Sequence, residues 1–210
     1  MQGRDLLGIA QTGTGKTAAF ALPILQRFAQ EPQKAAPFTA RALILAPTRE
    51  LAAQIADSFR AYGQLMRPSV GVVVGGVSHR PQIDMLSRGL DVLVATPGRL
   101  LDHIASGRFK PTTTQVLVLD EADHMLDLGF IAPIRQIVAK LAKNRQTLLF
   151  SATMPKEISG LAVDMLRNPA EVSVTPVATT AERVLQQVFL VDSGAKREVL
   201  LELLQGREIT

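Results

Sequence analysis

The sequence predicts an α/β fold, with a doubly wound, mostly parallel sheet flanked by helices. Short runs rich in Val, Ile and Leu recur along the chain, as expected for parallel strands that are buried on both faces. Segments with a helical period of apolar residues separate these runs and are suited to be crossover helices. No repeat of fixed period is present, which argues against a solenoid.

The expected elements follow in chain order. Strands are predicted at residues 6–10, 42–46, 70–74, 91–95, 116–119, 147–150 and 171–174. Helices are predicted between them at residues 17–30, 49–65, 82–87, 99–105, 131–142 and 156–166. Pro23 lies inside the first helical segment and is expected to kink it.

A domain boundary is predicted near the end of the chain. Residues 1–174 form the main domain, and residues 175–186 have the composition of a linker. Residues 187–210 contain one expected strand, 188–191, and one amphipathic helix, 195–204. One strand and one helix cannot form a core, so this part is expected to be the opening of a second domain.

Composition limits the classes of function. The chain has 210 residues, 47% of them hydrophobic, so it can bury a core of ordinary size. No apolar run is long enough to span a bilayer, and the absence of Cys excludes disulfides and is compatible with the cytoplasm. The net charge of +4 only weakly favours an anionic partner. With eight Phe, one Tyr and no Trp, base stacking on an aromatic platform is not expected, so any nucleic acid would be held by its backbone.

The glycine-rich stretch AQTGTGKT, residues 10–17, follows the first apolar run and precedes the first helix. Gly13 and Gly15 allow the backbone to approach phosphates closely, and the helix that follows presents its positive end. Lys16 would reach the terminal phosphates, and the Thr17 hydroxyl would bind Mg²⁺. A solvated glycine-rich turn is the alternative. The predicted phosphate-binding loop consists of Ala10, Gln11, Thr12, Gly13, Thr14, Gly15, Lys16 and Thr17, with Ala10 where the strict pattern has Gly.

A second chemical signal, Asp120 to Asp123 (DEAD), directly follows the apolar run 116–119. A carboxylate at the carboxyl end of a strand, on the same sheet edge as Lys16, is suited to anchor nucleotide-bound Mg²⁺. Glu121 could orient or deprotonate the attacking water. Alternatively, these acidic residues merely favour the start of a helix.

Four other segments also follow strands and therefore project from the same sheet edge. One interpretation is ordinary helix capping by Thr48, Thr96 and Thr153, with Pro97 in a first helical position. The other is a row of phosphate sites made by exposed helix starts together with Arg49 and Arg99. The segments are Pro47-Thr48-Arg49-Glu50-Leu51-Ala52, Gly75-Gly76, Thr96-Pro97-Gly98-Arg99 and Ser151-Ala152-Thr153.

The remaining chemical residue types give weaker signals. His79, His103 and His124 have no mutual metal-ligand spacing and no Cys partner, so a metal role is not expected for them. Ser151 has no plausible His base, so it is not expected to be a hydrolase nucleophile.

The motifs AQTGTGKT, PTRELA, GG, TPGR, DEAD and SAT occur in this order. With them the chain resembles the first RecA-like lobe of a bacterial DEAD-box ATP-dependent RNA helicase, and it is most similar to the RhlE-like branch. The resemblance covers residues 1–174 as a lobe, and residues 187–205 resemble the start of the second lobe.

The resemblance implies an enzyme that hydrolyses ATP, uses Mg²⁺ and remodels RNA. It assigns triphosphate and Mg²⁺ binding to Lys16 and Thr17, metal binding to Asp120 and water activation to Glu121. It also implies that three residues couple hydrolysis to closure of the two lobes, namely Asp123, Ser151 and Thr153. The positions that match the family's contacts to the RNA sugar-phosphate backbone are Pro47, Thr48, Arg49, Gly76, Thr96, Gly98 and Arg99, with Gly75 and Pro97 beside them.

The expected partners are RNA bound without sequence preference, the second RecA-like lobe and RNA-processing proteins, with no membrane. The family's adenine-reading segment would precede Met1, and Gln2 is not its glutamine. The family's arginine finger belongs to the second lobe, which is mostly absent. Two other classes of function remain open: a non-catalytic RNA- or protein-docking module, and a DNA-directed P-loop ATPase motor.

Overall fold

The computed structural model describes residues 3–11, 13–174 and 188–205. The chain divides into two compact units, Met1–Pro176 and Val177–Thr210, and the sheet lies in the first. Thr12, Gln2, the predicted linker 175–186 and the last five residues of the chain lie outside the described residues. None of the described helices is both long enough and apolar enough to cross a membrane.

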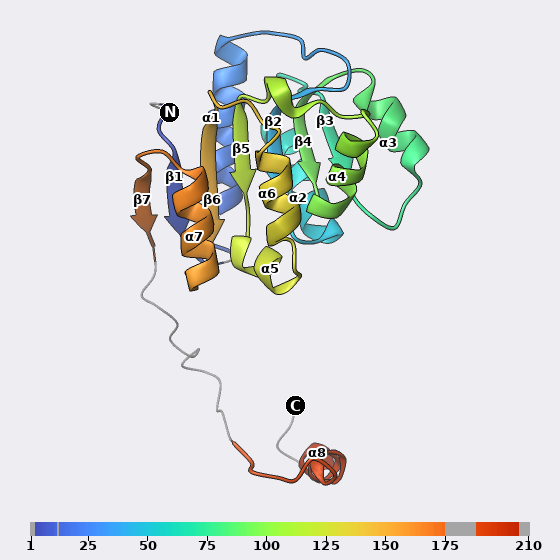
Figure 1. Ribbon diagram of the computed structural model, residues 1–210, viewed down its shortest axis with the longest axis vertical. Helices are drawn as coiled ribbons and strands as arrows, with labels where there is room; N and C mark the ends of the chain where they lie inside the picture. The colour runs from blue at the N-terminus through green and yellow to red at the C-terminus, as the bar shows by residue number, and fades with distance from the viewer. Residues whose placement is uncertain (1–2, 12, 175–187, 206–210) are drawn as a thin grey trace. The chain divides into compact units, whose positions relative to one another are not determined.

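The predicted parallel sheet is confirmed. Seven strands pair in the order β3-β4-β2-β5-β6-β1-β7, and every adjacent pair runs parallel (Figure 1). The strands are β1 (Leu6–Ile9), β2 (Ala40–Leu45), β3 (Val70–Val73), β4 (Leu90–Ala95), β5 (Val116–Leu119), β6 (Gln146–Ser151) and β7 (Ala170–Ser173).

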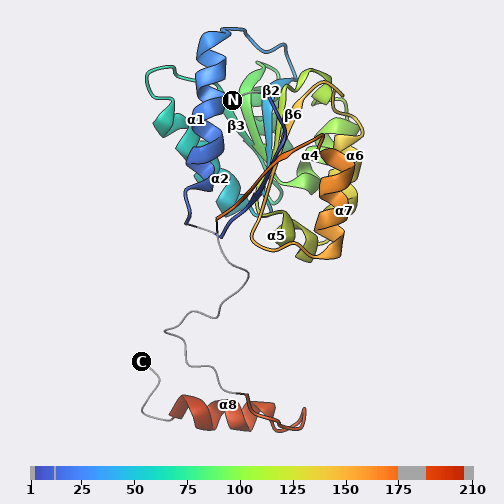
Figure 2. The ribbon, with the colours of Figure 1, turned by 90° about the vertical axis from the view of Figure 1, so that its left-hand side faces the viewer.

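Helices cover both faces of this sheet. Figure 2 shows α1 and α2 on one side and α4, α6 and α7 on the other. In the first unit the helices are α1 (Lys16–Gln30), α2 (Arg49–Tyr62), α3 (His79–Leu86), α4 (Pro97–Ala105), α5 (Ala122–Asp127), α6 (Ile131–Val138) and α7 (Lys156–Met165), with a short 3-10 turn, η1 (Pro111–Thr113). The bounds of the six predicted helices differ from the observed ones by up to four residues, and α1 continues through Pro23; no bounds were predicted for α5 or η1.

The side chains of each central strand are buried on both faces, which explains the continuous apolar runs. In β2, Ala42 and Ile44 face a cluster that contains Phe20, Phe59 and other residues of α1 and α2. The alternating residues Leu43 and Leu45 belong to the cluster on the other face. The period of two therefore separates two cores, and the strand ends are where polar side chains can gather.

In the second unit the structure corrects one prediction. Residues 188–191 form no strand, whereas α8 (Lys196–Gln205) matches the predicted helix. A strand needs a neighbouring strand to pair its backbone groups, and the described residues 188–205 contain only this helix besides loop. Apolar, β-branched residues alone therefore do not make 188–191 a strand.

Candidate nucleotide and RNA site

The glycine-rich loop connects β1 to α1 at the carboxyl edge of the sheet. Gly13 and Gly15 have φ values of 84° and 83°, a left-handed conformation that side-chain-bearing residues rarely adopt. Gly15 is also the N-cap of α1, so the helix starts at Lys16 with its free N–H groups directed at the loop. This is the backbone arrangement of an anion site. Gln11, Gly13, Thr14 and Gly15 are exposed, Thr17 is half-buried and Ala10 is buried.

Lys16 lies inside the loop and is only 9% exposed. Its Nζ donates a hydrogen bond of 2.9 Å to the carbonyl of Ala10. An ammonium has three donors, so this bond fixes the direction of Lys16 and leaves two donors for phosphate oxygens.

Asp120 is buried just beyond β5, with 3% exposure. Burial raises the pKa of Asp120 to about 6, and the nearby ammonium of Lys16 limits that rise. The interaction between these two charges supports the expectation that the loop and the strand end belong to one site. The Oδ1 atom of Asp120 also accepts a hydrogen bond of 3.1 Å from the N–H of Glu121.

Glu121 has φ 54° and ψ 56°, in the left-handed region, although it carries a side chain. Such a conformation costs about 1 kcal/mol or more and persists only where the surroundings enforce it. Glu121 is the N-cap of α5, and its Oε2 lies 3.4 Å from Nδ1 of His124. The strained turn therefore directs the Glu121 side chain back toward His124 in the first turn of α5.

The SAT segment is bonded to both nucleotide motifs. The N–H of Ala10 donates to the carbonyl of Ser151 at 3.0 Å, and the N–H of Asp123 donates to the Ser151 hydroxyl at 3.2 Å. The Asp123 carboxylate accepts bonds of 2.9 Å from both the N–H and the hydroxyl of Thr153. Burial raises the pKa of Asp123, but the hydrogen bonds from Thr153 and Ser151 outweigh burial and hold it below its ordinary value.

The three threonines predicted as helix caps differ in the structure. Thr48 is the N-cap of α2, and its hydroxyl accepts a hydrogen bond of 3.2 Å from the N–H of Leu51. Thr96 is the N-cap of α4, with Pro97 following it, but it makes no side-chain capping bond. The capping interpretation of Thr153 is wrong, because Pro155 is the N-cap of α7 and the Thr153 hydroxyl bonds to Asp123 instead.

Arg49 and Arg99 both contact the loop that follows β3. Nη1 of Arg49 lies 3.5 Å from the carbonyl of Gly75, and Nη1 of Arg99 donates a bond of 2.8 Å to the carbonyl of Val77. Gly76 has φ 75°, and a Cβ on it would lie 2.4 Å from Nη1 of Arg49. The structure thus brings together the PTRELA, GG and TPGR segments. Pro47, Thr96 and Pro97 are buried, Thr48, Gly75, Gly98 and Arg99 are half-buried, and Arg49 and Gly76 are exposed.

Sequence reasoning missed two residues that hold this loop. Nε2 of Gln82 donates to the carbonyl of Val74 at 3.0 Å, so its Oε1 faces Nε2 of His103, also at 3.0 Å. The ring nitrogen of His103 must therefore donate, and burial lowers the pKa of His103, with the charges of His79 and Arg99 adding to this effect. Gln82 and His103 are 21 residues apart on two helices, so no local pattern indicates their contact.

Among the described residues, no cluster of three or more His, Asp or Glu side chains could hold a metal ion alone. Among the side-chain oxygens at this edge, the buried carboxylate of Asp120 and the hydroxyl of Thr17 are the predicted ligands. This donor set fits Mg²⁺ that is bound mainly through nucleotide phosphates and water rather than by a protein cage.

Comparisons with known proteins identify the family of this chain. Residues 1–161 match the family model described as DEAD/DEAH box helicase. The chain is 41% identical over 204 residues to the DEAD-box ATP-dependent RNA helicase RhpA of Helicobacter pylori, covering 97% of this chain and 40% of that protein. It is 44% identical over 206 residues to the RNA helicase CrhR of Synechocystis, and this match covers 98% of this chain and 41% of CrhR. The chain thus spans about 40% of the length of these relatives.

Two solved structures share the fold. A hypothetical ATP-dependent RNA helicase from Sulfolobus tokodaii matches with a TM-score of 0.74 and 38% identity, over 82% of this chain and 49% of that one. The yeast DEAD-box splicing factor Prp28 matches with a TM-score of 0.79 and 35% identity, over 96% of this chain and 48% of the Prp28 chain. The predicted RecA-like lobe is therefore confirmed, whereas the assignment to the RhlE-like branch stays a prediction.

Proposed function

The chain belongs to the DEAD/DEAH box helicase family, and on that premise we propose that it is the ATP- and RNA-binding first lobe of an ATP-dependent RNA helicase. We assign residues 1–174 to this lobe, 175–186 to the linker and 187–210 to the opening of the second lobe. The observation that carries the proposal is the set of hydrogen bonds joining Ala10, Ser151, Asp123 and Thr153, because it links the phosphate loop, the DEAD motif and the SAT motif.

In this proposal the loop of residues 10–17 holds the nucleotide. Its N–H groups and the free donors of Lys16 bind phosphate oxygens, while Thr17 and Asp120 supply oxygen ligands for Mg²⁺. The bound Mg²⁺ would neutralise charge on the phosphates. The buried position of Asp120 strengthens its attraction to cations, because few water molecules screen the carboxylate.

Glu121 is the proposed general base. Its carboxylate would accept a proton from the attacking water, and the oxygen of that water would form the new bond to phosphorus as the bond to the leaving diphosphate breaks. The left-handed turn at Glu121 supports this role, since strained backbone at a charged residue is typical of sites that require one side-chain direction.

RNA would bind at the loop and helix starts beyond β2, β3 and β4. The N-termini of α2 and α4 direct N–H groups toward this edge and suit phosphate oxygens. Base edges play no part in such contacts, so binding would be independent of sequence. A cytoplasmic location, the second lobe and RNA-processing proteins as partners stay predictions.

The test is ATP hydrolysis by the protein at its full length, measured with single-stranded RNA, with DNA of the same sequence and with neither. We expect stimulation by RNA only. Lys16→Ala should abolish nucleotide binding, whereas Glu121→Gln should retain binding and slow hydrolysis by about 100-fold or more.

Asp127→Asn is a matched control for Glu121→Gln, since it also removes one carboxylate from the DEAD helix but at an exposed position. It should leave hydrolysis unchanged. Equal stimulation by DNA would favour a DNA-directed motor, and hydrolysis that survives Glu121→Gln would show that another group activates the water.

A further inference from the structure

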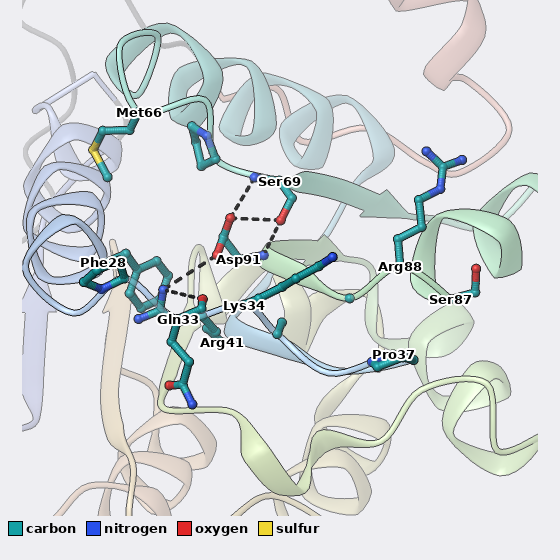
Figure 3. Close-up of a pocket in the computed structure, with 14 residues that line it drawn as sticks. Phe28, Gln33, Lys34, Pro37, Arg41, Met66, Ser69, Ser87, Arg88 and Asp91 are labelled. Carbon is teal, nitrogen blue, oxygen red and sulfur yellow. Dashed lines mark hydrogen bonds and ion pairs between the residues drawn. The ribbon is translucent and has the colours of Figure 1, made fainter.

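A large pocket lies at the other edge of the sheet, where β2, β3 and β4 begin (Figure 3). Its volume is about 1110 Å³. None of the residues assigned above to nucleotide or RNA lines it, because those residues follow the carboxyl ends of the strands. The lining residues are Phe28, Pro32, Gln33, Lys34, Ala35, Pro37, Arg41, Met66, Pro68, Ser69, Ser87, Arg88, Gly89 and Asp91.

The floor of the pocket is held by Arg41, which is 5% exposed. Its guanidinium stacks on the Phe28 ring at 3.8 Å, donates to the carbonyls of Glu31 and Gln33, and lies 3.7 Å from Asp91. Asp91 in turn accepts bonds of 2.8 and 2.9 Å from the N–H and hydroxyl of Ser69. The charges of Arg41 and Asp91 therefore compensate each other, and these contacts hold the Arg41 side chain in one direction.

Two other cations of the pocket have no such compensation. Lys34 and Arg88 are exposed, and within the described residues their side chains make no hydrogen bond or ion pair. Among the lining residues the carboxylate belongs to Asp91, and it lies beside Arg41, so it does not compensate the charges of Lys34 and Arg88. The open side of the pocket thus carries a net positive charge that suits carboxylates.

The walls between these cations are apolar. Pro32, Pro37 and Pro68 line the pocket with Met66, which is 42% exposed, and Figure 3 shows Met66 and Phe28 on the side opposite Arg88. Leu65, next to Met66 in the loop that follows α2, is also apolar and is 94% exposed. Met and rigid apolar side chains at the surface are typical of protein–protein contacts.

We propose that this pocket docks an acidic segment of another protein, whose apolar side chain packs against Met66 and whose carboxylates face Lys34 and Arg88. RNA fits less well. The helices α1, α2 and α3 all end at this edge, and the partial negative charge of helix carboxyl ends disfavours an anion at every nucleotide. A segment with a few carboxylates can place each one beside a free cation. Such a partner would leave the nucleotide and RNA edge accessible.

The test begins with selection of random twelve-residue peptides displayed on phage against the immobilised chain. We expect the enriched peptides to carry Asp or Glu beside Leu, Phe or Met. One labelled enriched peptide is then titrated by fluorescence anisotropy against the wild type and against the double variant Lys34→Glu/Arg88→Glu. The double variant should bind at least about tenfold more weakly, a loss of about 1.4 kcal/mol.

The matched control is Lys140→Glu/Lys143→Glu, which makes the same charge change at two exposed lysines outside the pocket. It should retain peptide affinity within about twofold, since neither lysine lines the pocket and exposed charges outside a contact are screened by salt. If the charge-reversed chain does not fold, the milder Lys34→Gln/Arg88→Gln variant tests whether these two charges are needed for peptide binding. Both pocket variants should bind a labelled single-stranded uridine oligonucleotide as the wild type does.

Three results would overturn the proposal. The first is no enrichment, or enriched peptides without acidic residues. The second is equal loss of peptide binding in the pocket variants and in the lysine control. The third is loss of oligonucleotide binding in the pocket variants alone, which would assign Lys34 and Arg88 to RNA.

Discussion

Replacing Asp120 by Asn should stabilise the metal-free protein at neutral pH, although Asp120 is proposed to be essential for hydrolysis. Asp120 is 3% exposed, and burial raises its pKa from 3.8 to about 6 despite the attraction of Lys16. At about 1.4 kcal/mol per pKa unit, ionised Asp120 costs the folded state about 3 kcal/mol. Asn keeps the shape and an oxygen that can accept the N–H of Glu121, but it needs no ionisation.

The pH dependence of the stability gained by Asp120→Asn tests whether ionisation of Asp120 is the cause of that gain. Because the folded-state pKa of Asp120 is raised, the penalty is absent below the unfolded value of 3.8, grows between 3.8 and about 6, and is complete above that. We therefore expect the advantage of Asp120→Asn to be about 3 kcal/mol at pH 8 and about 1 kcal/mol at pH 4.5.

The assay is urea unfolding followed by circular dichroism, with a chelator present so that no divalent metal contributes. Asp127→Asn, at an exposed position of α5, is the control and should change the free energy of unfolding by less than about 0.5 kcal/mol. A variant that is less stable than the wild type at pH 8, or an advantage that is equal at the two pH values, would refute the reasoning.

Three further predictions concern the same edge of the sheet. Glu121→Gly should be more stable than Glu121→Gln by about 1 kcal/mol in urea unfolding, because glycine relieves the left-handed strain. Both variants should lose hydrolysis, and equal stabilities of the two would mean that the turn is not strained. Thr153→Val should cost about 1 kcal/mol at pH 7 and raise the pKa of Asp123 in an NMR titration. The cost should shrink as the pH falls below 3.8 and through the lowered pKa of Asp123, and an unchanged pKa would contradict the assigned bond. His103→Gln keeps a donor for Gln82 but cannot ionise, so its thermal midpoint should fall less than that of the wild type when the pH is lowered from 7.5 to 5.5. Identical falls in the two midpoints would show that His103 does not cause the loss of stability in acid.

The sequence was sufficient for the fold and for which segments share an edge. In a parallel sheet every strand ends at the same side, so residues after β1, β5 and β6 must lie near one another once the apolar runs are recognised. It was not sufficient for individual contacts. The bond between Thr153 and Asp123 and the bond between Gln82 and His103 join different elements, and capping preferences pointed Thr153 to its own helix instead. The strand predicted at 188–191 failed for a related reason, since strand formation depends on a partner and not only on composition.

The contacts of the two arginines change how the proposed RNA edge is built. Arg99 is half-buried, with its guanidinium bonded to the Val77 carbonyl and 3.8 Å from Asp102, so little of its charge is free for a phosphate. Arg49 lies against Gly75 and Gly76 from the other side. Both side chains therefore brace the loop after β3 between α2 and α4. Phosphates would then be held mainly by N–H groups of that loop and of the helix starts, whose positions depend on the arginines. Geometry rather than net charge would thus set the affinity of this edge for RNA, consistent with a chain whose net charge is only +4.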